Sequence, residues 1–251
     1  MYKTILLVFF CITSMLANPE CYKEGYGELI RSANDHEIVF KNGTVLPYRT
    51  NDLKNTWDEK LTNADLEMQI SQTYRIDSDL TINYLYSPGR LRYQPFFQAI
   101  YGQDEVSISK NLVTIKWQTT NGHKNLLVSK IFGINEKLIE INKEILKLPF
   151  KERIFADSVG TYNYRFIKDT NRLSMHSYGI AIDLSPSATQ YWKNEAQSET
   201  SKITYKNSMP LSIVRIFEKY GFIWGGRWYH YDTMHFEYRP ELLAPSCFNQ
   251  K

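Results

Sequence analysis

The chain has 251 residues, of which 43% are hydrophobic and 23% are charged. This composition excludes a disordered chain, a collagen and a coiled coil, and the length suits one large domain or two small ones. The formal net charge is only +3, and nucleic-acid-binding proteins usually carry a strongly basic face. The sequence therefore argues against nucleic acid as the partner.

The N-terminal segment has the features of a secretory signal peptide. A short basic start with Lys3 is followed by an apolar run from Ile5 to Ile12 and by the small residue Ala17. This pattern predicts a signal peptide over residues 1–17, whereas an uncleaved N-terminal anchor is the alternative. The apolar run is shorter than the roughly 20 residues that span a bilayer. We therefore expect an exported protein, without stable membrane insertion, in the periplasm or cell-wall space.

The three cysteines fit an oxidising compartment. Cys11 leaves with the predicted signal peptide, so that the pair Cys21 and Cys247 remains. An even number of cysteines in an exported protein predicts a disulfide, which here would join the two ends of the mature chain. Two unpaired thiols are the alternative, because a sequence does not show whether the two Cα atoms approach to within about 7 Å.

The first half of the chain contains few regular patterns. Residues 22–60 are mixed and polar, whereas apolar residues between 61 and 70 indicate one short helix. Residues 96–101 also have helical spacing. A change in pattern leads us to expect an N-terminal accessory region over residues 18–125 and a catalytic domain over 126–251.

A hairpin is predicted around this boundary. Apolar and polar residues alternate over 113–117, which is typical of a half-buried strand. Asn121-Gly122 is a strong hairpin turn signal, and a returning strand is expected over residues 126–132.

The second half of the chain predicts helices and strands without regular βαβ alternation. One apolar stripe predicts a helix over 135–148; it consists of Ile134, Leu138, Ile141, Ile145 and Leu148. A second helix is expected from Pro210 to Gly221, with Leu211, Val214 and Phe217 facing inward. Strands are expected over 179–184 and 234–238, and residues 187–207 read as a polar surface loop. The fold class predicted from this pattern is α+β.

Two of the five histidines lie in segments that also contain acidic residues. In the first segment, His176 precedes Asp183 by seven residues. On a strand, Asp183 faces away from the apolar residues around it, and a carboxylate on a mostly buried strand needs a partner such as a metal ion. In the second segment, Asp232 precedes His235 by three residues.

Together these segments predict a catalytic zinc site. His176, Asp183 and His235 make a set of three ligands that leaves the fourth position open, as in catalytic rather than structural zinc sites. Asp232 supplies a further carboxylate beside the site, where it could accept a proton from water that the metal activates.

The same residues carry a family resemblance. The pattern Ser-x-His-x-x-Gly-x-Ala-x-Asp over 174–183, followed by Asp-x-Met-His-Phe-Glu over 232–237, resembles the zinc D-alanyl-D-alanine carboxypeptidase family. It is similar to the VanY-like branch, which includes peptidoglycan L-alanyl-D-glutamate endopeptidases. Residues 160–165 and 221–228 extend the resemblance, which covers about residues 130–243 and leaves 22–110 without assigned chemistry.

The resemblance implies a fold and a set of roles. The implied fold is the small hedgehog/DD-peptidase-like zinc peptidase fold, here with an N-terminal accessory region. One zinc ion would be held by His176, Asp183 and His235. Asp232 stands where the family has its general base; the dipeptidase branch has Glu there. Arg165 matches the arginine that stabilises the oxyanion, with Arg172 as a nearby competitor.

Several further residues are candidates with two interpretations each. Glu237 either orients a ligand imidazole or only pairs with Arg239. Ser174 either contacts substrate or forms a turn. Substrate contact is also the expectation for Tyr178, Trp224 and Trp228, whereas the two tryptophans could equally be core residues.

The sequence supports two function classes. The first is an exported, monomeric zinc peptidase acting on peptidoglycan stem peptides or muropeptides, by D-alanyl-D-alanine carboxypeptidase or L-Ala-D-Glu endopeptidase action. The alternative is a zinc-stabilised cell-wall binding protein without turnover. Asp232 argues against the alternative, because a binding-only site needs no base. A metal nuclease is disfavoured by the near-neutral charge.

Overall fold

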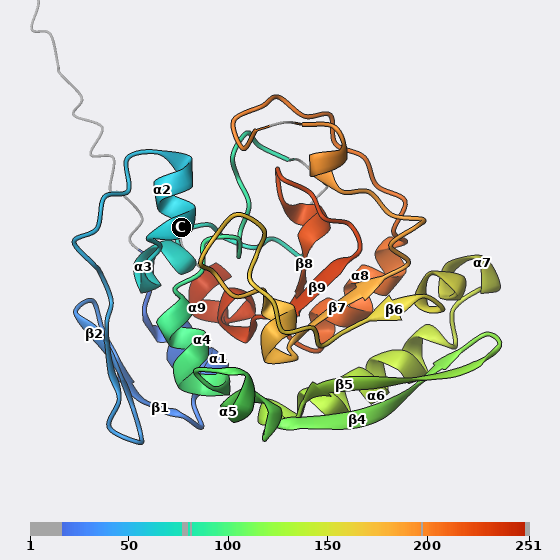
Figure 1. Cartoon of the computed structure of the whole chain (residues 1–251), viewed down its shortest axis with the longest axis horizontal. Helices are drawn as coiled ribbons and strands as arrows, with labels where there is room; N and C mark the ends of the chain where they lie inside the picture. Colours follow the sequence, from blue (N-terminus) through green and yellow to red (C-terminus); the bar gives the residue numbers. More distant parts are fainter. Residues whose placement is uncertain (1–16, 77–79, 81, 197, 249–251) are drawn as a thin grey trace, which may run out of the picture.

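The computed structural model describes residues 17–76, 80, 82–196 and 198–248 (Figure 1). The predicted signal peptide and Cys11 fall almost entirely outside the described residues, of which Ala17 is the first. Helices and antiparallel sheets make up the described chain, which confirms the α+β class. Within this part of the chain, no helix is long and apolar enough to cross a membrane.

The N-terminal region has more regular structure than its polar sequence indicates. A three-stranded antiparallel sheet follows helix α1, in the order β1-β2-β3, and two short helices replace the single helix expected between 61 and 70. The elements are α1 (Glu20–Tyr26), β1 (Ile30–Ala33), β2 (Glu37–Phe40), β3 (Val45–Pro47), α2 (Trp57–Thr62) and α3 (Leu66–Gln69). The two helices begin at separate N-caps, because the Thr56 side chain caps α2 and the Asp65 side chain caps α3.

The predicted hairpin is present as a separate two-stranded sheet. Helices α4 (Gln94–Tyr101) and α5 (Glu105–Ser109) lead into β4 (Leu112–Thr119) and β5 (Gly122–Ser129). The returning strand starts earlier and ends earlier than expected. After Ser129 the chain forms the 3-10 helix η1 (Ile131–Gly133), in which Phe132 has a φ of +56° that no strand residue adopts.

Both predicted helices of the second half form. Helix α6 (Ile134–Ile145) buries Ile134, Leu138, Ile141 and Ile145 of the expected stripe. It ends three residues earlier than expected, so Leu148 lies beyond it and is only partly buried. Helix α7 (Phe150–Arg153) follows Pro149. Helix α8 (Leu211–Lys219) begins after Pro210 and is followed by Gly221, whose φ is +89°. Val214 and Phe217 face inward as predicted, but Leu211 is 40% exposed because it lies in the first turn, outside the stripe formed by Ile213, Val214 and Phe217.

The central element is a four-stranded antiparallel sheet with the order β6-β7-β9-β8. Its strands are β6 (Val159–Gly160), β7 (Ala181–Leu184), β8 (Phe222–Trp224) and β9 (His235–Tyr238). Strands β7 and β9 were predicted, each within a longer range, whereas β6 and β8 have only two and three residues. Asp183 of β7 pairs directly with His235 of β9, so the sheet brings together a carboxylate and an imidazole that are distant in sequence.

One large apolar core extends from the N-terminal region to the C-terminal segment. Helix α1 packs against the 3-10 helix η6 (Pro240–Leu243) and against α9 (Pro245–Phe248). Cys21 and Cys247 form the predicted disulfide, with their Cα atoms 5.7 Å apart. The boundary expected near residue 125 lies inside strand β5; the division into an accessory region and a catalytic domain stays a prediction.

Candidate metal centre and active site

Short structural elements hold the three predicted ligands. His176 lies in the 3-10 helix η3 (Met175–Tyr178), which is capped by the Ser174 side chain and ends at Gly179 in the left-handed conformation. Asp183 and His235 lie opposite each other on β7 and β9. Along β7, Ile182 and Leu184 are buried on one face, and therefore Asp183 projects from the other.

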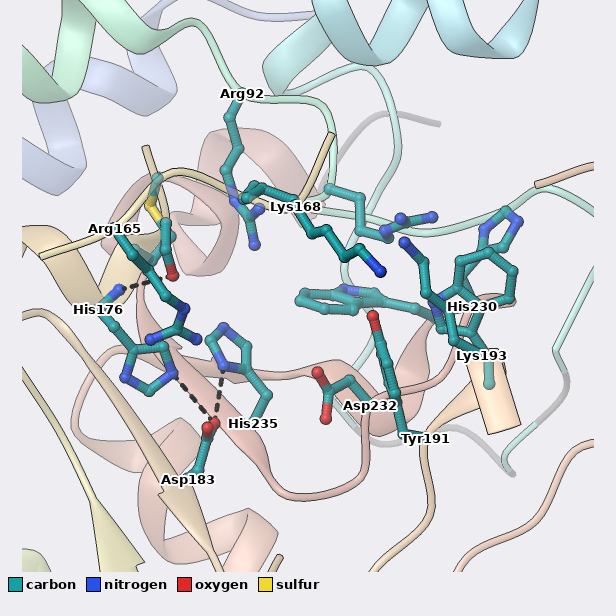
Figure 2. A pocket seen from close by; sticks show the side chains of 16 residues that line it. Arg92, Arg165, Lys168, His176, Asp183, Tyr191, Lys193, His230, Asp232 and His235 are labelled. Carbon is teal, nitrogen blue, oxygen red and sulfur yellow. Dashed lines mark hydrogen bonds and ion pairs between the residues drawn. The ribbon is translucent and has the colours of Figure 1, made fainter. Parts of the chain in front are cut away.

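The three side chains converge on one point (Figure 2). Asp183 Oδ1 lies 3.0 Å from His235 Nδ1 and 3.2 Å from His176 Nε2. One ligand atom from each of the three residues lies within 4.8 Å of the others. Both imidazoles are almost fully buried, with 3% of His176 and 7% of His235 exposed. The spacing, the burial and the nitrogen–oxygen donor set fit a single divalent cation such as zinc.

Each imidazole uses its other ring nitrogen to contact the protein. Nδ1 of His176 lies 2.6 Å from the carbonyl oxygen of Thr161, and Nε2 of His235 lies 3.0 Å from Glu237 Oε2. Such contacts orient ligand imidazoles in metal sites. The Nε2 atom of His176 is buried and has no hydrogen-bond partner among the described residues, because its approach to Asp183 has poor geometry for a hydrogen bond. A metal ion would satisfy this nitrogen.

Charges in this cluster depend strongly on one another. Burial alone would raise the pKa of Asp183, but the close contacts with the His176 and His235 imidazoles outweigh burial and hold it well below its usual range. Burial would likewise lower the pKa of His235, but its contacts with Asp183 and Glu237 raise it to about 10. The protein thus stabilises a carboxylate at the point where a cation would bind.

Asp232 lies beside this cluster, in the loop before β9, and its side chain points into the same cavity (Figure 2). Its backbone is fixed on two sides, since Asp232 N donates to Gly225 O at 3.0 Å and the residue forms a β-bridge with Tyr191. The Oδ1 atom is buried without a hydrogen-bond partner among the described residues. Burial and the nearby Asp183 charge raise the pKa of Asp232 to about 7, although His235 opposes the shift.

A cavity of about 360 Å³ contains the three candidate ligands and Asp232. Its walls are rich in cationic and aromatic side chains. The lining residues outside the ligand set are Arg90, Arg92, Arg165, Ile167, Lys168, Ser174, Met175, Tyr191, Trp192, Lys193, Trp228, His230 and Asp232.

Of the two candidate arginines, only Arg165 lines this cavity. Its side chain has no ion-pair partner among the described residues, and Figure 2 shows it beside His176. Arg172 lines a different pocket with residues of the 166–171 loop. Burial, together with the charges of Arg92 and Arg90, lowers the pKa of Arg172 to about 10.

Two of the predicted substrate contacts are wrong. Tyr178 is fully buried against Phe97 and Tyr101 and does not line the cavity. Trp224 is also fully buried: its Nε1 donates to the carbonyl oxygen of Thr233 at 2.9 Å, and its ring stacks near Phe236. Both are core residues, because the turn after Tyr178 and the position of Trp224 in the sheet direct these large rings inward.

The other two predicted contacts do border the cavity. Trp228 forms part of its wall, with its ring centroid 5.7 Å from that of His235. Ser174 reaches the cavity as well, but its Oγ accepts a hydrogen bond from His176 N at 3.3 Å. The hydroxyl thus forms the turn that holds His176.

Sequence reasoning missed the contribution of the N-terminal region and of the 187–207 loop. Arg90 and Arg92 both line the cavity, and Arg90 makes a bidentate ion pair with Glu199 of the loop at 2.8 and 3.1 Å. In the sequence, the only sign of this contribution was that two arginines, Arg90 and Arg92, flank Leu91. A sequence motif of this length does not show which distant carboxylates an arginine meets.

The geometry describes a candidate metal-dependent hydrolase site, with three ligands, a nearby carboxylate and a cationic cavity. A model of the D-alanyl-D-alanine carboxypeptidase family matches residues 168–238, which include all three candidate ligands and Asp232. Searches of curated proteins and of solved structures gave no match. The family resemblance is therefore confirmed for the part of the chain that carries the site, and this family is one of zinc peptidases.

Proposed function

We propose that this chain is an exported zinc peptidase that hydrolyses a peptide bond in peptidoglycan stem peptides. His176, Asp183 and His235 would hold one zinc ion. When bound, the metal would polarise the scissile carbonyl and activate water. The two reactions, D-alanyl-D-alanine carboxypeptidase and L-Ala-D-Glu endopeptidase action, require the same ligand set.

One observation carries the proposal: Asp232 shares the cavity of the three ligands and has an oxygen without a hydrogen-bond partner among the described residues. A carboxylate in this position accepts a proton from water and returns it to the leaving amine. A pKa raised to about 7 suits proton transfer at neutral pH. The alternative of a zinc-stabilised binding protein gives this side chain no role.

The remaining cavity residues suit an anionic peptide. Arg165 would donate to the developing oxyanion, because it lies beside the ligand cluster. Lys168 and Lys193 have no ion-pair partner among the described residues, and Figure 2 shows them at the other end of the cavity from Asp183. Stem peptides carry free carboxylates, which such ammonium groups bind. The cationic lining therefore supports an acidic peptide as substrate.

Export is supported by two features. The predicted signal peptide would direct the chain out of the cytoplasm. The disulfide between Cys21 and Cys247 suits an oxidising compartment, since such bonds rarely persist in the cytosol.

The test is the substitution Asp232→Asn, with zinc content and hydrolysis of purified muropeptides as readouts. We expect the variant to keep one zinc ion per chain and to lose turnover by roughly 10²- to 10⁴-fold, the range typical of a lost general base. Asp58→Asn is the matched control, because Asp58 is exposed on α2 and does not line the cavity.

Product masses distinguish the two reactions, since loss of one D-alanine marks the carboxypeptidase and cleavage after L-alanine marks the endopeptidase. Full turnover by Asp232→Asn would show that the base is another group. Zinc-loaded wild-type protein that binds muropeptides but releases no product would favour the binding protein instead.

A further inference from the structure

Glu237 is a fully buried carboxylate with four hydrogen-bond contacts. It lies two residues after His235 on β9, so both side chains project from the same face of the strand. Its Oε2 atom lies 3.0 Å from His235 Nε2, on the side of the ring away from Asp183. The orientation of the His235 ring therefore depends on where Glu237 is held.

Two arginines hold Glu237, and they come from different parts of the chain. Arg239 Nη1 donates to Oε1 at 2.8 Å, and this arginine also donates to Glu241. Arg92 contacts both oxygens, with Nη2 2.5 Å from Oε2 and Nε 3.3 Å from Oε1. Of these two arginines, only Arg92 donates to Oε2, the oxygen that faces His235.

Arg92 is well fixed in this position. Its side chain is 12% exposed, and its guanidinium lies 5.8 Å from the centroid of the Trp228 ring. Trp228 in turn donates from Nε1 to the carbonyl oxygen of Pro88 at 2.6 Å, so the 87–92 segment is attached to the cavity wall. The segment that carries Arg92 belongs to the region for which the sequence indicated no chemistry.

We propose that Arg92 is a positioning residue for the candidate metal centre, acting through Glu237 on His235. The inference rests on the proposed zinc site, but not on the peptidase reaction. Without Arg92, Oε2 of Glu237 loses its only arginine donor among the described residues. The carboxylate can then turn toward Arg239, and His235 Nε2 loses its fixed partner. Groups that orient a ligand imidazole typically change metal affinity by roughly 10- to 100-fold when removed.

The test measures zinc affinity by competition with a chromophoric chelator, which requires no substrate. We expect Arg92→Met to weaken zinc binding by roughly 10- to 100-fold. Arg92→Lys, which keeps the charge but not the two-pronged geometry, should recover part of the loss. Arg49→Met is the matched control: Arg49 makes a bidentate pair with Glu67 at 2.7 and 2.6 Å in the same region, but 43% of its side chain is exposed, and it lies outside the cavity lining.

A double variant shows whether Arg92 acts through Glu237. If it does, Arg92→Met combined with Glu237→Gln should bind zinc no more weakly than Glu237→Gln alone. Additive losses would overturn the proposal, and so would wild-type zinc affinity in a folded Arg92→Met protein. If Arg92→Met does not fold, the test uses Arg92→Lys only. A zinc affinity equal to that of wild type in Arg92→Lys would then contradict the proposal. Failure of the peptidase proposal would appear separately, as a wild-type protein that binds zinc tightly but releases no product.

Discussion

His230 lies in the same cavity as the candidate metal ligands, yet other groups hold its ring. Nε2 lies 2.7 Å from the carbonyl oxygen of Glu199, and Nδ1 lies 3.3 Å from Ser87 Oγ. Burial, reinforced by the positive charge of Arg90, lowers the pKa of His230 to about 4. The ring is therefore neutral in the folded protein at neutral pH and joins the 187–207 loop to the N-terminal region.

This shift predicts a pH dependence of stability. In the unfolded chain the pKa returns to about 6.5, so between pH 6.5 and 4 the unfolded state binds more protons and stability falls with falling pH. The contribution reaches at most about 3.5 kcal/mol, at roughly 1.4 kcal/mol for each pH unit between 6.5 and 4. The substitution His230→Gln should remove this contribution, so the free energy of unfolding should depend less on pH between 4 and 6.5.

The measurement is urea unfolding at a series of pH values from 4 to 8, for wild type and His230→Gln. The exposed His36 provides the control substitution, His36→Gln. If the free energy of unfolding changes with pH by the same amount in wild type and His230→Gln, the His230 imidazole has the same pKa in the folded and unfolded states, and the prediction is wrong.

Residue identities at the candidate site were largely predictable, whereas contacts were not. The structure brings His176, Asp183 and His235 together, as expected from two short motifs whose residue types suit a metal, and their role as ligands stays a prediction. Tyr178 and Trp224 were misassigned, since a motif does not show into which side of a turn or sheet a ring points. Arg92 was missed because its partner Glu237 is 145 residues away in sequence.

Among the structural elements, the turn at Gly179 positions His176 most directly. Gly179 has a φ of +68°, which disfavours any residue with a Cβ atom. A Cβ there would also lie 2.5 Å from Leu112 Cδ2 and 3.0 Å from Ser129 N, so the Leu112 side chain would have to shift and the Ser129 backbone would be crowded.

We therefore expect Gly179→Ala to lower the free energy of unfolding by about 2–3 kcal/mol, from backbone strain and from steric overlap. Zinc affinity should fall as well, because His176 precedes the strained turn. Gly43→Ala separates the two causes: Gly43 has a φ of +90° but no atom within 4 Å of the added Cβ, so only the cost of about 1–2 kcal/mol for backbone strain applies. Denaturant titrations that give equal losses for both variants would exclude the overlap with Leu112 and Ser129.

Elements were predictable in proportion to their length and periodicity. Helices α6 and α8 carry apolar stripes over several turns, and strands β7 and β9 lie in apolar segments, so each had a clear signal. The sheet β1-β2-β3 was missed because its strands have only three or four residues and gain their stability from pairing with one another. Such pairing depends on contacts that local sequence does not encode.

In the whole molecule, the N-terminal region and the segment matched by the family model share one apolar core. The disulfide reinforces this arrangement, because it joins residues 226 positions apart and attaches α1 to α9. The sequence predicted the pairing from cysteine number and compartment, but the shared core depends on long-range packing that periodicity does not reveal.

Replacing both cysteines, Cys21→Ser with Cys247→Ser, should lower the free energy of unfolding by roughly 2–5 kcal/mol, since the cross-link restricts a long loop in the unfolded chain. Zinc affinity at low temperature should change little, as neither cysteine contacts the candidate ligands. The comparison is denaturant unfolding of the oxidised wild type, the reduced wild type and the variant. Equal midpoints for oxidised and reduced protein would contradict a stabilising bond.

The proposed metal centre requires that two imidazoles and one carboxylate hold a single zinc ion with one side left open for substrate. X-ray diffraction at the zinc absorption edge, from crystals of the zinc-loaded protein, tests this requirement most directly. We predict one anomalous peak bonded to His176 Nε2, His235 Nδ1 and an oxygen of Asp183, with no other protein ligand. A peak elsewhere, no peak at this site, or a fourth protein side chain on the metal would contradict the proposed centre.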